Sequence, residues 1–260
     1  MNANLLQEFR KKINSGQPVF GPFMKTCDPA FVEAAGWAGM DFAILDMEHG
    51  PVSIESMQNN IRGAQVAGIL PVVRVPAITE EAIGKALDIG AAAVEIPQIT
   101  NASQAREAVK IAKFYPAGER GVCRFVRAAR YSTMSGQDYF TDANDTLVIA
   151  QLEGTEAIAN MKEILAVEGI DIVFIGPYDL SQSLGIPGQT THPRVVEAMK
   201  EMIAAAKENG VVIGTFTDSE ETMKMWIDAG VQYISYSVDV GIFADSCRKL
   251  TDVFRGYVNR

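Results

Sequence analysis

The sequence is poor in the residues that mark several classes of protein. Its 260 residues include only two histidines and three widely separated cysteines, Cys27, Cys123 and Cys247. No CxxC pair is present, so nothing in the sequence indicates a zinc site or a redox dithiol. The first thirty residues also lack the uninterrupted apolar core of a secretory signal. We therefore expect a cytoplasmic protein with reduced thiols.

Long apolar runs and an excess of positive charge are also absent. No stretch approaches the roughly 18 consecutive apolar residues of a membrane span, so we expect no membrane partner. The net charge is −9, which excludes a broad basic footprint for nucleic acid. Local arginines can still bind an anionic small molecule, and we expect a small molecule as the ligand.

What the sequence does have is a regular alternation of short β-rich runs and amphipathic helical segments. The expected strands cover residues 19–23, 42–46, 71–75, 93–97, 147–152, 172–175, 211–215 and 233–236. The expected helices include residues 54–67, 80–89, 104–113, 156–166, 194–209 and 219–229, many of which stop at a glycine: Gly36, Gly68, Gly90, Gly169, Gly210 and Gly230. A short helix over residues 4–13 precedes them.

Eight strands that alternate with helices require parallel pairing through crossover connections. The strand at 172–175 is apolar at every position, which suits burial on both faces. No linker divides the chain. We predict an α/β fold, a closed (β/α)8 TIM barrel with a leading helix, as one domain over residues 1–260. An open doubly wound sheet is the alternative, but it would prefer a G-x-G-x-x-G turn that is missing.

Residues 114–145 form the one irregular segment, and they carry Arg120, Arg124, Arg127 and Arg130. A connection of this length in a compact domain is usually functional or disordered. Its arginines could bind a substrate carboxylate or cover the barrel mouth. A solvated loop or a subunit contact explains them equally well. His192, before Pro193, most simply marks the start of the next helix.

The end of the second expected strand carries the strongest chemical signal. Asp46, Glu48 and His49 follow the apolar run 42–45 and precede a Gly-Pro turn. Imidazole beside carboxylate is a proton-transfer pair that works near neutral pH. A polar loop with a capping acid is the alternative explanation.

Other strand ends carry similar residues, and a TIM barrel collects its chemistry there. Arg74 lies in an apolar strand and needs an anion, either a ligand oxygen or a structural partner such as Glu48 or Glu95. Glu153 and Asp179, on adjacent strands, suit one divalent cation. Helix capping would also explain these two acids.

Five motifs together resemble the HpcH/HpaI aldolase family of class II, metal-dependent pyruvate aldolases, which includes 4-hydroxy-2-oxoheptanedioate and 2-dehydro-3-deoxygalactarate aldolases. The resemblance runs from about Gly16 to the C-terminus. The motifs are Asp46-Met47-Glu48-His49-Gly50-Pro51, Val73-Arg74-Val75-Pro76, Tyr115-Pro116-Ala117-Gly118-Glu119-Arg120-Gly121, Gln151-Leu152-Glu153 and Val173-Phe174-Ile175-Gly176-Pro177-Tyr178-Asp179-Leu180-Ser181.

The resemblance implies a carbon–carbon lyase that reversibly cleaves a 4-hydroxy-2-oxo acid to pyruvate and an aldehyde. The reaction would pass through a metal-stabilised pyruvate enolate, with Mg²⁺, Mn²⁺ or Co²⁺ as the cofactor. It also implies a homo-oligomer, a hexamer or trimer of dimers, in which the last helix is exchanged between subunits.

The resemblance also implies a role for each matching residue. Glu153 and Asp179 match the metal ligands, and Gln151 matches a residue beside metal and substrate. Arg74 matches the contact to the pyruvate keto oxygen, and His49 matches the base that works with a metal-side water. The remaining matches are Asp46, the acid paired with that histidine; Asp88, an acid that reaches a neighbouring subunit's site; and the main chain of Gly176, Pro177, Tyr178 and Asp179, which holds the pyruvate carboxylate.

Three positions depart from the family pattern and affect the expected substrate. Tyr178 stands where alanine or serine is usual, Glu95 occupies a usually apolar strand position, and Ser237-Val238-Asp239 replaces a glycine-containing turn. Three other functions remain open: a Schiff-base aldolase that uses Lys25, a CoA-thioester lyase of the citryl or malyl type with its CoA phosphates on the arginine-rich segment, and a keto-acid-binding barrel without catalysis.

Overall fold

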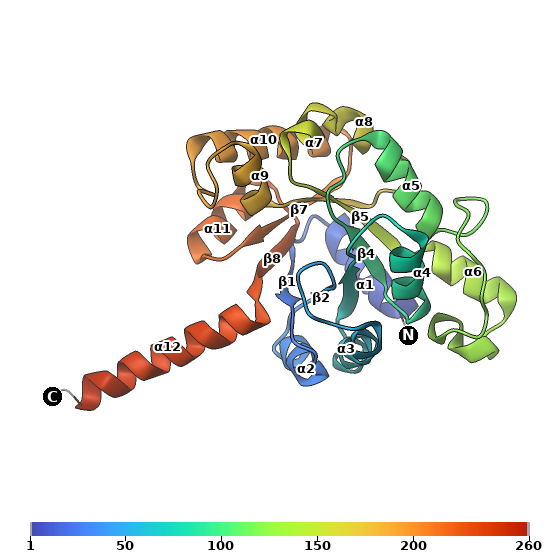
Figure 1. Ribbon diagram of the computed structural model, residues 1–260, viewed down its shortest axis with the longest axis horizontal. Helices are drawn as coiled ribbons and strands as arrows, with labels where there is room; N and C mark the ends of the chain where they lie inside the picture. The colour runs from blue at the N-terminus through green and yellow to red at the C-terminus, as the bar shows by residue number, and fades with distance from the viewer. Residues whose placement is uncertain (1, 259–260) are drawn as a thin grey trace.

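The computed structural model describes residues 2–258, and within them eight parallel strands close into a barrel in chain order (Figure 1). The pairing of β1 with β8 completes the closure. The predicted (β/α)8 TIM barrel is therefore confirmed, and the open doubly wound sheet is wrong. The strands are β1 (Val19–Met24), β2 (Phe42–Asp46), β3 (Leu70–Arg74), β4 (Ala93–Ile96), β5 (Leu147–Leu152), β6 (Ile172–Ile175), β7 (Val212–Thr217) and β8 (Tyr233–Val238).

Helices surround the barrel, and most begin at a side-chain cap. Ser53 caps one helix by accepting a hydrogen bond from the Ser56 amide, and Gly68 ends that helix in the left-handed conformation. His192 caps another, as predicted, through Nδ1. The helices are α1 (Asn2–Asn14), α2 (Pro29–Trp37), α3 (Ile54–Ala67), α4 (Glu80–Asp88), α5 (Ala102–Ala112), α6 (Gly136–Asn144), α7 (Thr155–Ala159), α8 (Met161–Leu165), α9 (Pro177–Ser183), α10 (Pro193–Glu208), α11 (Glu220–Ala229), α12 (Asp239–Val258) and the 3₁₀ turn η1 (Arg127–Ser132).

The leading helix α1 closes the amino-terminal end of the barrel. Leu6, Phe9 and Ile13 are buried in one cluster with the residues that fill the barrel interior. The Phe9 ring meets Phe42 and Tyr233 edge-on, with centroids 6.2 Å apart in each case. Because this end is plugged by apolar side chains, the carboxyl ends of the strands are left to form a site.

Three local expectations are wrong in detail. The segment 114–145 is not irregular throughout, because it contains η1 and α6. The predicted helix 156–166 is divided into α7 and α8 at Asn160. Gly36 does not end a helix: α2 continues to Trp37, and a Cβ at Gly36 would lie 2.6 Å from the Ala67 Cβ, so this glycine permits close packing of α2 on α3.

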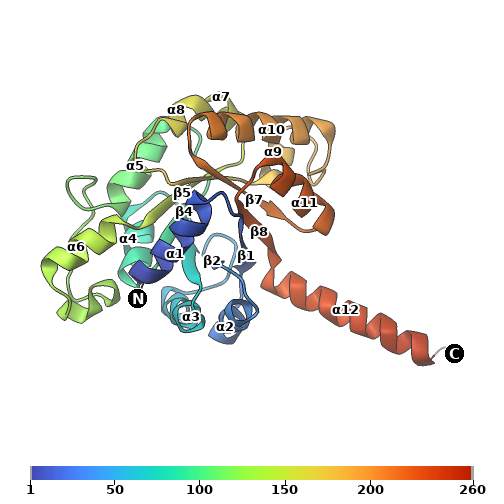
Figure 2. The same ribbon diagram turned by 180° about the vertical axis from the view of Figure 1, so that it is seen from behind.

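Helix α12 projects away from the barrel, as both views show (Figures 1 and 2). Its 20 residues expose large apolar side chains along its length, including Val240, Phe243, Leu250, Val253, Phe254 and Val258. An apolar face of this size on a projecting helix needs a partner surface. The exchange of this helix between subunits stays a prediction.

Within residues 2–258, no helix combines the length and apolar character needed to cross a membrane. The cytoplasmic location stays a prediction.

Candidate active site

A cavity of about 300 Å³ opens at the carboxyl ends of the strands. The residues that line it come from the carboxyl ends of seven strands, all but β4, and from the start of α9, so much of the predicted site lies on one surface. Its lining is Phe23, Lys25, His49, Arg74, Gln151, Phe174, Gly176, Pro177, Tyr178, Asp179, Phe216 and Val238.

Asp46 and Arg74 form a buried ion pair at the ends of β2 and β3. The two residues are paired in register, and Arg74 donates to Asp46 through both Nε (2.9 Å) and Nη2 (2.7 Å). Burial is the largest single effect and disfavours both charges, but the hydrogen bonds and the attraction of opposite charges together outweigh it, so the Asp46 pKa is lowered and the Arg74 pKa is raised. The Arg74 guanidinium also lies 4.6 Å above the Phe23 ring. Both charges are therefore fixed in place.

His49 is directed to the cavity by the turn that follows β2. Asp46 Oδ1 accepts hydrogen bonds from the main-chain amides of Glu48 and His49. The His49 imidazole itself has Glu48 as its carboxylate neighbour, with Nε2 4.0 Å from Oε2. That same Glu48 oxygen lies 3.1 Å from Arg74 Nη1. Glu48, which the sequence left without a firm role, thus joins the arginine to the imidazole.

Glu95 lies beneath this group, fully buried on β4 in register with Arg74. Neither of its carboxylate oxygens has a hydrogen-bond partner among the described residues. Burial raises the pKa of Glu95 to about 8; the charge of Arg74 opposes this, and Asp46, Glu153 and Glu48 add to it. Glu95 is therefore a neutral acid at pH 7, and it is not the ion-pair partner of Arg74 that the sequence allowed.

Two carboxylates, Glu153 and Asp179, lie on the β5–β6 side of the barrel mouth. Glu153 Oε2 accepts a hydrogen bond from Gln151 Nε2 (2.5 Å), and Oε1 accepts one from the main-chain amide of Gln98 (2.9 Å). The Glu153 pKa is raised to about 7, chiefly by burial; the Gln151 hydrogen bond opposes this rise, and the nearby carboxylate of Asp179 contributes to it. Gly176 makes room for this group, because a Cβ there would lie 3.0 Å from Glu153 Oε2.

These residues fit a divalent cation. Two carboxylates that repel one another gain from a shared cation, and Gln151 adds an amide oxygen that is buried without a partner among the described residues. No group of three or more His, Cys, Asp or Glu residues suited to a metal occurs within residues 2–258. Glu153 and Asp179 would therefore leave the remaining ligand positions to water and substrate oxygens.

Sequence reasoning missed the partners that hold several site residues. Asp239, at the start of α12, accepts from the amides of Lys25 and Thr26 and so fixes the end of β1. Asp218, after β7, accepts from the Tyr178 hydroxyl at 2.5 Å. Gln98, with φ 57°, turns its amide to Glu153. Each of the three is a polar residue just beyond a strand or at the start of a helix. That position was the only feature of the sequence that could have identified them as partners of site residues.

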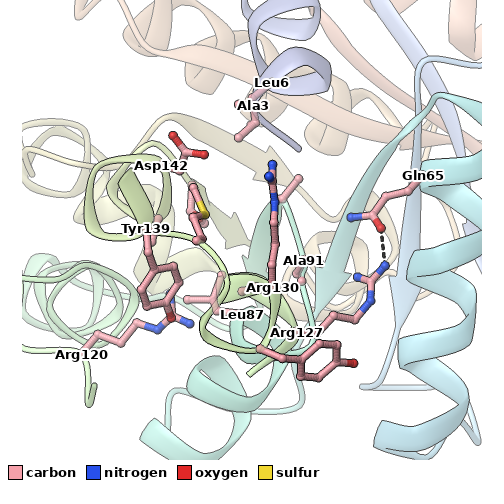
Figure 3. Close-up of a pocket in the computed structure, with 17 residues that line it drawn as sticks. Ala3, Leu6, Gln65, Leu87, Ala91, Arg120, Arg127, Arg130, Tyr139 and Asp142 are labelled. Carbon is pink, nitrogen blue, oxygen red and sulfur yellow. Dashed lines mark hydrogen bonds between the residues drawn. The ribbon is translucent and has the colours of Figure 1, made fainter. Parts of the chain in front are cut away.

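The arginine-rich segment lies away from the barrel mouth. Arg120, Arg127 and Arg130 line a different cavity of about 310 Å³, beside Ala91 and Thr146 at the amino ends of β4 and β5 (Figure 3). Arg127 donates to Gln65 and to the Ile89 carbonyl, and Arg124 donates to the carbonyls of Ser132 and Met134. The segment therefore supplies no basic surface at the strand tips.

Asp88, the last residue of α4, is also remote from the site of its own chain. It forms a 2.7 Å ion pair with the buried guanidinium of Arg120. Of the predicted residues, the structure thus brings His49, Arg74, Gln151 and Asp179 to one cavity, with Asp46 and Glu153 directly behind them. Asp88 is the exception.

Known proteins resemble this chain over most of its length. A 2-dehydro-3,6-dideoxy-6-sulfogluconate aldolase of Pseudomonas putida is 33% identical over 91% of this chain and 92% of its own. A hydroxypyruvate/pyruvate aldolase of Roseobacter denitrificans is 31% identical over 94% and 96%. A crystal structure of an HpcH/HpaI aldolase/citrate lyase family protein from Burkholderia cenocepacia superposes with a TM-score of 0.90 at 32% identity, covering 95% of this chain and 99% of that one.

These relatives confirm the prediction of an aldolase-class enzyme. The model of the HpcH/HpaI aldolase/citrate lyase family matches residues 20–246. The chain belongs to this family.

Proposed function

We propose that this protein is a divalent-metal-dependent aldolase that reversibly cleaves a 4-hydroxy-2-oxo acid to pyruvate and an aldehyde. One observation carries the proposal: two carboxylates, Glu153 and Asp179, share the strand tips with Arg74 and with the exposed imidazole of His49. Cleavage of a carbon–carbon bond beta to a carbonyl needs stabilisation of charge on the keto oxygen and a base for the hydroxyl proton. This set of residues supplies both.

Glu153 and Asp179 would hold the cation, with Gln151 beside it. The cation supplies Lewis-acid charge at the keto oxygen of the substrate. The chain's own contribution to that oxygen is Arg74, whose Nε and Nη2 are committed to Asp46. A guanidinium fixed in this way needs no reorganisation when charge develops.

The pyruvate carboxylate would lie at the start of α9, where Gly176, Pro177, Tyr178 and Asp179 line the cavity. Pro177 has no N–H group, so the main-chain donors there are the amides of Tyr178 and Asp179. This placement follows the family resemblance, and the cavity lining supports it.

His49 would take the proton from the 4-hydroxyl during cleavage, or from the pyruvate methyl group during condensation, through a water molecule. Its side chain is 61% exposed, and Glu48 is its nearest carboxylate. The contact of Asp46 with His49 is through the main-chain amide, so Asp46 would position the turn and the arginine rather than the imidazole ring.

The active protein would be a homo-oligomer built from the single domain formed by residues 1–260. The apolar face of α12 supports packing on a second copy. The position of Asp88 outside its own site supports its donation to a neighbouring one. The family resemblance implies that this oligomer is a hexamer or a trimer of dimers and that its subunits exchange the last helix.

The test is pyruvate release from a panel of 4-hydroxy-2-oxo acids with Mg²⁺, Mn²⁺ or Co²⁺, and with EDTA. We expect activity with at least one cation and none with EDTA. The Schiff-base alternative rests on Lys25, which lines the cavity with Nζ 3.8 Å from Asp46 Oδ2. Borohydride with pyruvate would label Lys25 in that case, whereas metal-dependent catalysis predicts no label and full loss of activity with EDTA.

A further inference from the structure

Tyr178 separates two hollows at the barrel mouth. On one side lies the catalytic cavity of about 300 Å³. On the other lies a hollow of about 10 Å³, lined by Asp218, Thr190, Thr222 and Trp226, which is little more than room for one water molecule. Pro177, Tyr178 and Phe216 line both. The phenol ring is therefore part of the wall that limits the catalytic cavity.

The ring is held in this position by contacts on two sides. The Tyr178 hydroxyl donates to Asp218 Oδ2 at 2.5 Å, and its ring meets Phe216 edge-on with centroids 5.9 Å apart. Because the hydroxyl hydrogen is committed to Asp218, it is not free to bind a substrate oxygen.

The rest of this wall is apolar and carries no free cation. Phe23, Phe174, Phe216 and Val238 complete it. Two cations line the cavity: Arg74 is committed to Asp46 and Glu48, and the Lys25 ammonium lies 3.8 Å from Asp46, on the β2 side. No described lysine or arginine forms an ion pair with Asp218. A charged group placed against this wall would lose hydration without gaining a partner.

We infer that Tyr178, anchored by Asp218, sets the length and charge of the aldehyde half, so that the site takes short, uncharged aldehydes. The inference rests on the proposed function, because the aldehyde must lie beside the bound pyruvate. An aldehyde with a long chain meets the phenol ring. An aldehyde with an anionic end meets aromatic side chains backed by the Asp218 carboxylate.

The test compares kcat/KM for aldol addition of pyruvate, with Mg²⁺, to acetaldehyde, hexanal and succinic semialdehyde. The native protein should prefer acetaldehyde to both others.

Tyr178→Ala joins the two hollows and should raise the hexanal-to-acetaldehyde ratio of kcat/KM by roughly 10-fold or more, the scale of methylene discrimination in apolar pockets. Tyr178→Phe and Asp218→Asn keep a ring but lose its anchor, and should raise the ratio a few-fold. Asp228→Asn, a charge removal on the exposed face of α11, is the matched control and should leave the ratio unchanged.

A second measurement separates the two possible failures. Exchange of pyruvate methyl protons in D₂O by the native protein with Mg²⁺ reports enolate formation without any aldehyde. No exchange overturns the proposed function and this inference with it. Exchange with an unchanged hexanal-to-acetaldehyde ratio in Tyr178→Ala overturns the inference alone. So does a native preference for succinic semialdehyde over acetaldehyde.

Discussion

The two halves of the barrel mouth differ in how their charges are balanced. On the β2–β3 side, Asp46 and Glu48 are matched by Arg74 through contacts of 2.7 to 3.1 Å. On the β5–β6 side, Glu153 and Asp179 face one another without a cation from the described residues. Burial and this neighbour raise the Glu153 pKa to about 7.

The two sides thus differ in whether the chain itself supplies the positive charge that balances the carboxylates. On the β2–β3 side, the chain itself balances the charges, because Arg74 is already oriented by its carboxylate partners. On the β5–β6 side, the proposed external cation would supply the balancing charge. Substitutions on the two sides should therefore impair the protein in different ways.

The largest effect is expected from Asp179→Asn. Loss of one of two carboxylates should lower Mn²⁺ affinity by roughly 100-fold and turnover by 1,000-fold or so, since the cation's charge is needed in every turnover. The metal-free variant should melt at a temperature no lower than the native protein, because a like-charge contact with Glu153 is removed. Calorimetric titration with Mn²⁺ and a melting curve check both. Unchanged Mn²⁺ affinity would contradict the assignment.

His49→Ala should lower turnover by roughly 10²- to 10⁴-fold, the usual contribution of a general base. The imidazole side chain is 61% exposed, so stability should stay within about 0.5 kcal/mol. Mn²⁺ affinity should not change. If the variant loses metal as Asp179→Asn does, His49 is a ligand and the base must be sought elsewhere.

Arg74→Lys tests the balanced half. A lysine keeps the charge but not the bidentate contact with Asp46, so turnover should fall by roughly 100-fold, and unfolding should become easier by about 2 kcal/mol. Mn²⁺ affinity should be preserved. Urea denaturation alongside steady-state kinetics measures both effects; a loss of activity without any loss of stability would place the Asp46–Arg74 pair outside the structural framework.

Glu95→Gln should change the pH dependence of stability. The folded protein holds the Glu95 proton up to about pH 8, whereas the unfolded chain releases it near pH 4.5. Stability from this group is therefore full below pH 4.5 and is lost as the pH rises to about 8. The difference corresponds to on the order of 5 kcal/mol.

Glutamine cannot ionise, so the variant should be more stable than the native protein at pH 8 and closer to it at pH 5. Denaturation of the metal-free proteins at several pH values tests this. Parallel curves for the two proteins would mean that Glu95 is ionised in the fold and has a partner.

The sequence predicted the barrel because its evidence was periodic and local. The strand at residues 172–175 and the helix at residues 54–67 were located to the residue, since short apolar runs and glycine stops are read along the chain. The segment 114–145 was misjudged because α6 is only nine residues long and Tyr139 is its one buried residue.

The position of the candidate site residues at the strand ends was predictable from the sequence, but the contacts between them were not. Strand ends identified Asp46, Arg74 and Glu153, because a parallel barrel collects them at one rim. The pairing of carboxylates with cationic groups depends on the register between strands. Asp46 lies opposite Arg74, and Glu48 is the carboxylate next to the imidazole of His49. The Tyr178–Asp218 contact joins residues 40 positions apart in sequence, beyond the reach of any local pattern.

The most direct test of the account is an anomalous diffraction map of crystals soaked with Mn²⁺ and pyruvate. We expect one manganese peak between Glu153 and Asp179, with the pyruvate keto oxygen on the side of Arg74. A peak at Glu48 and Glu95, or pyruvate bound there without metal, would contradict it.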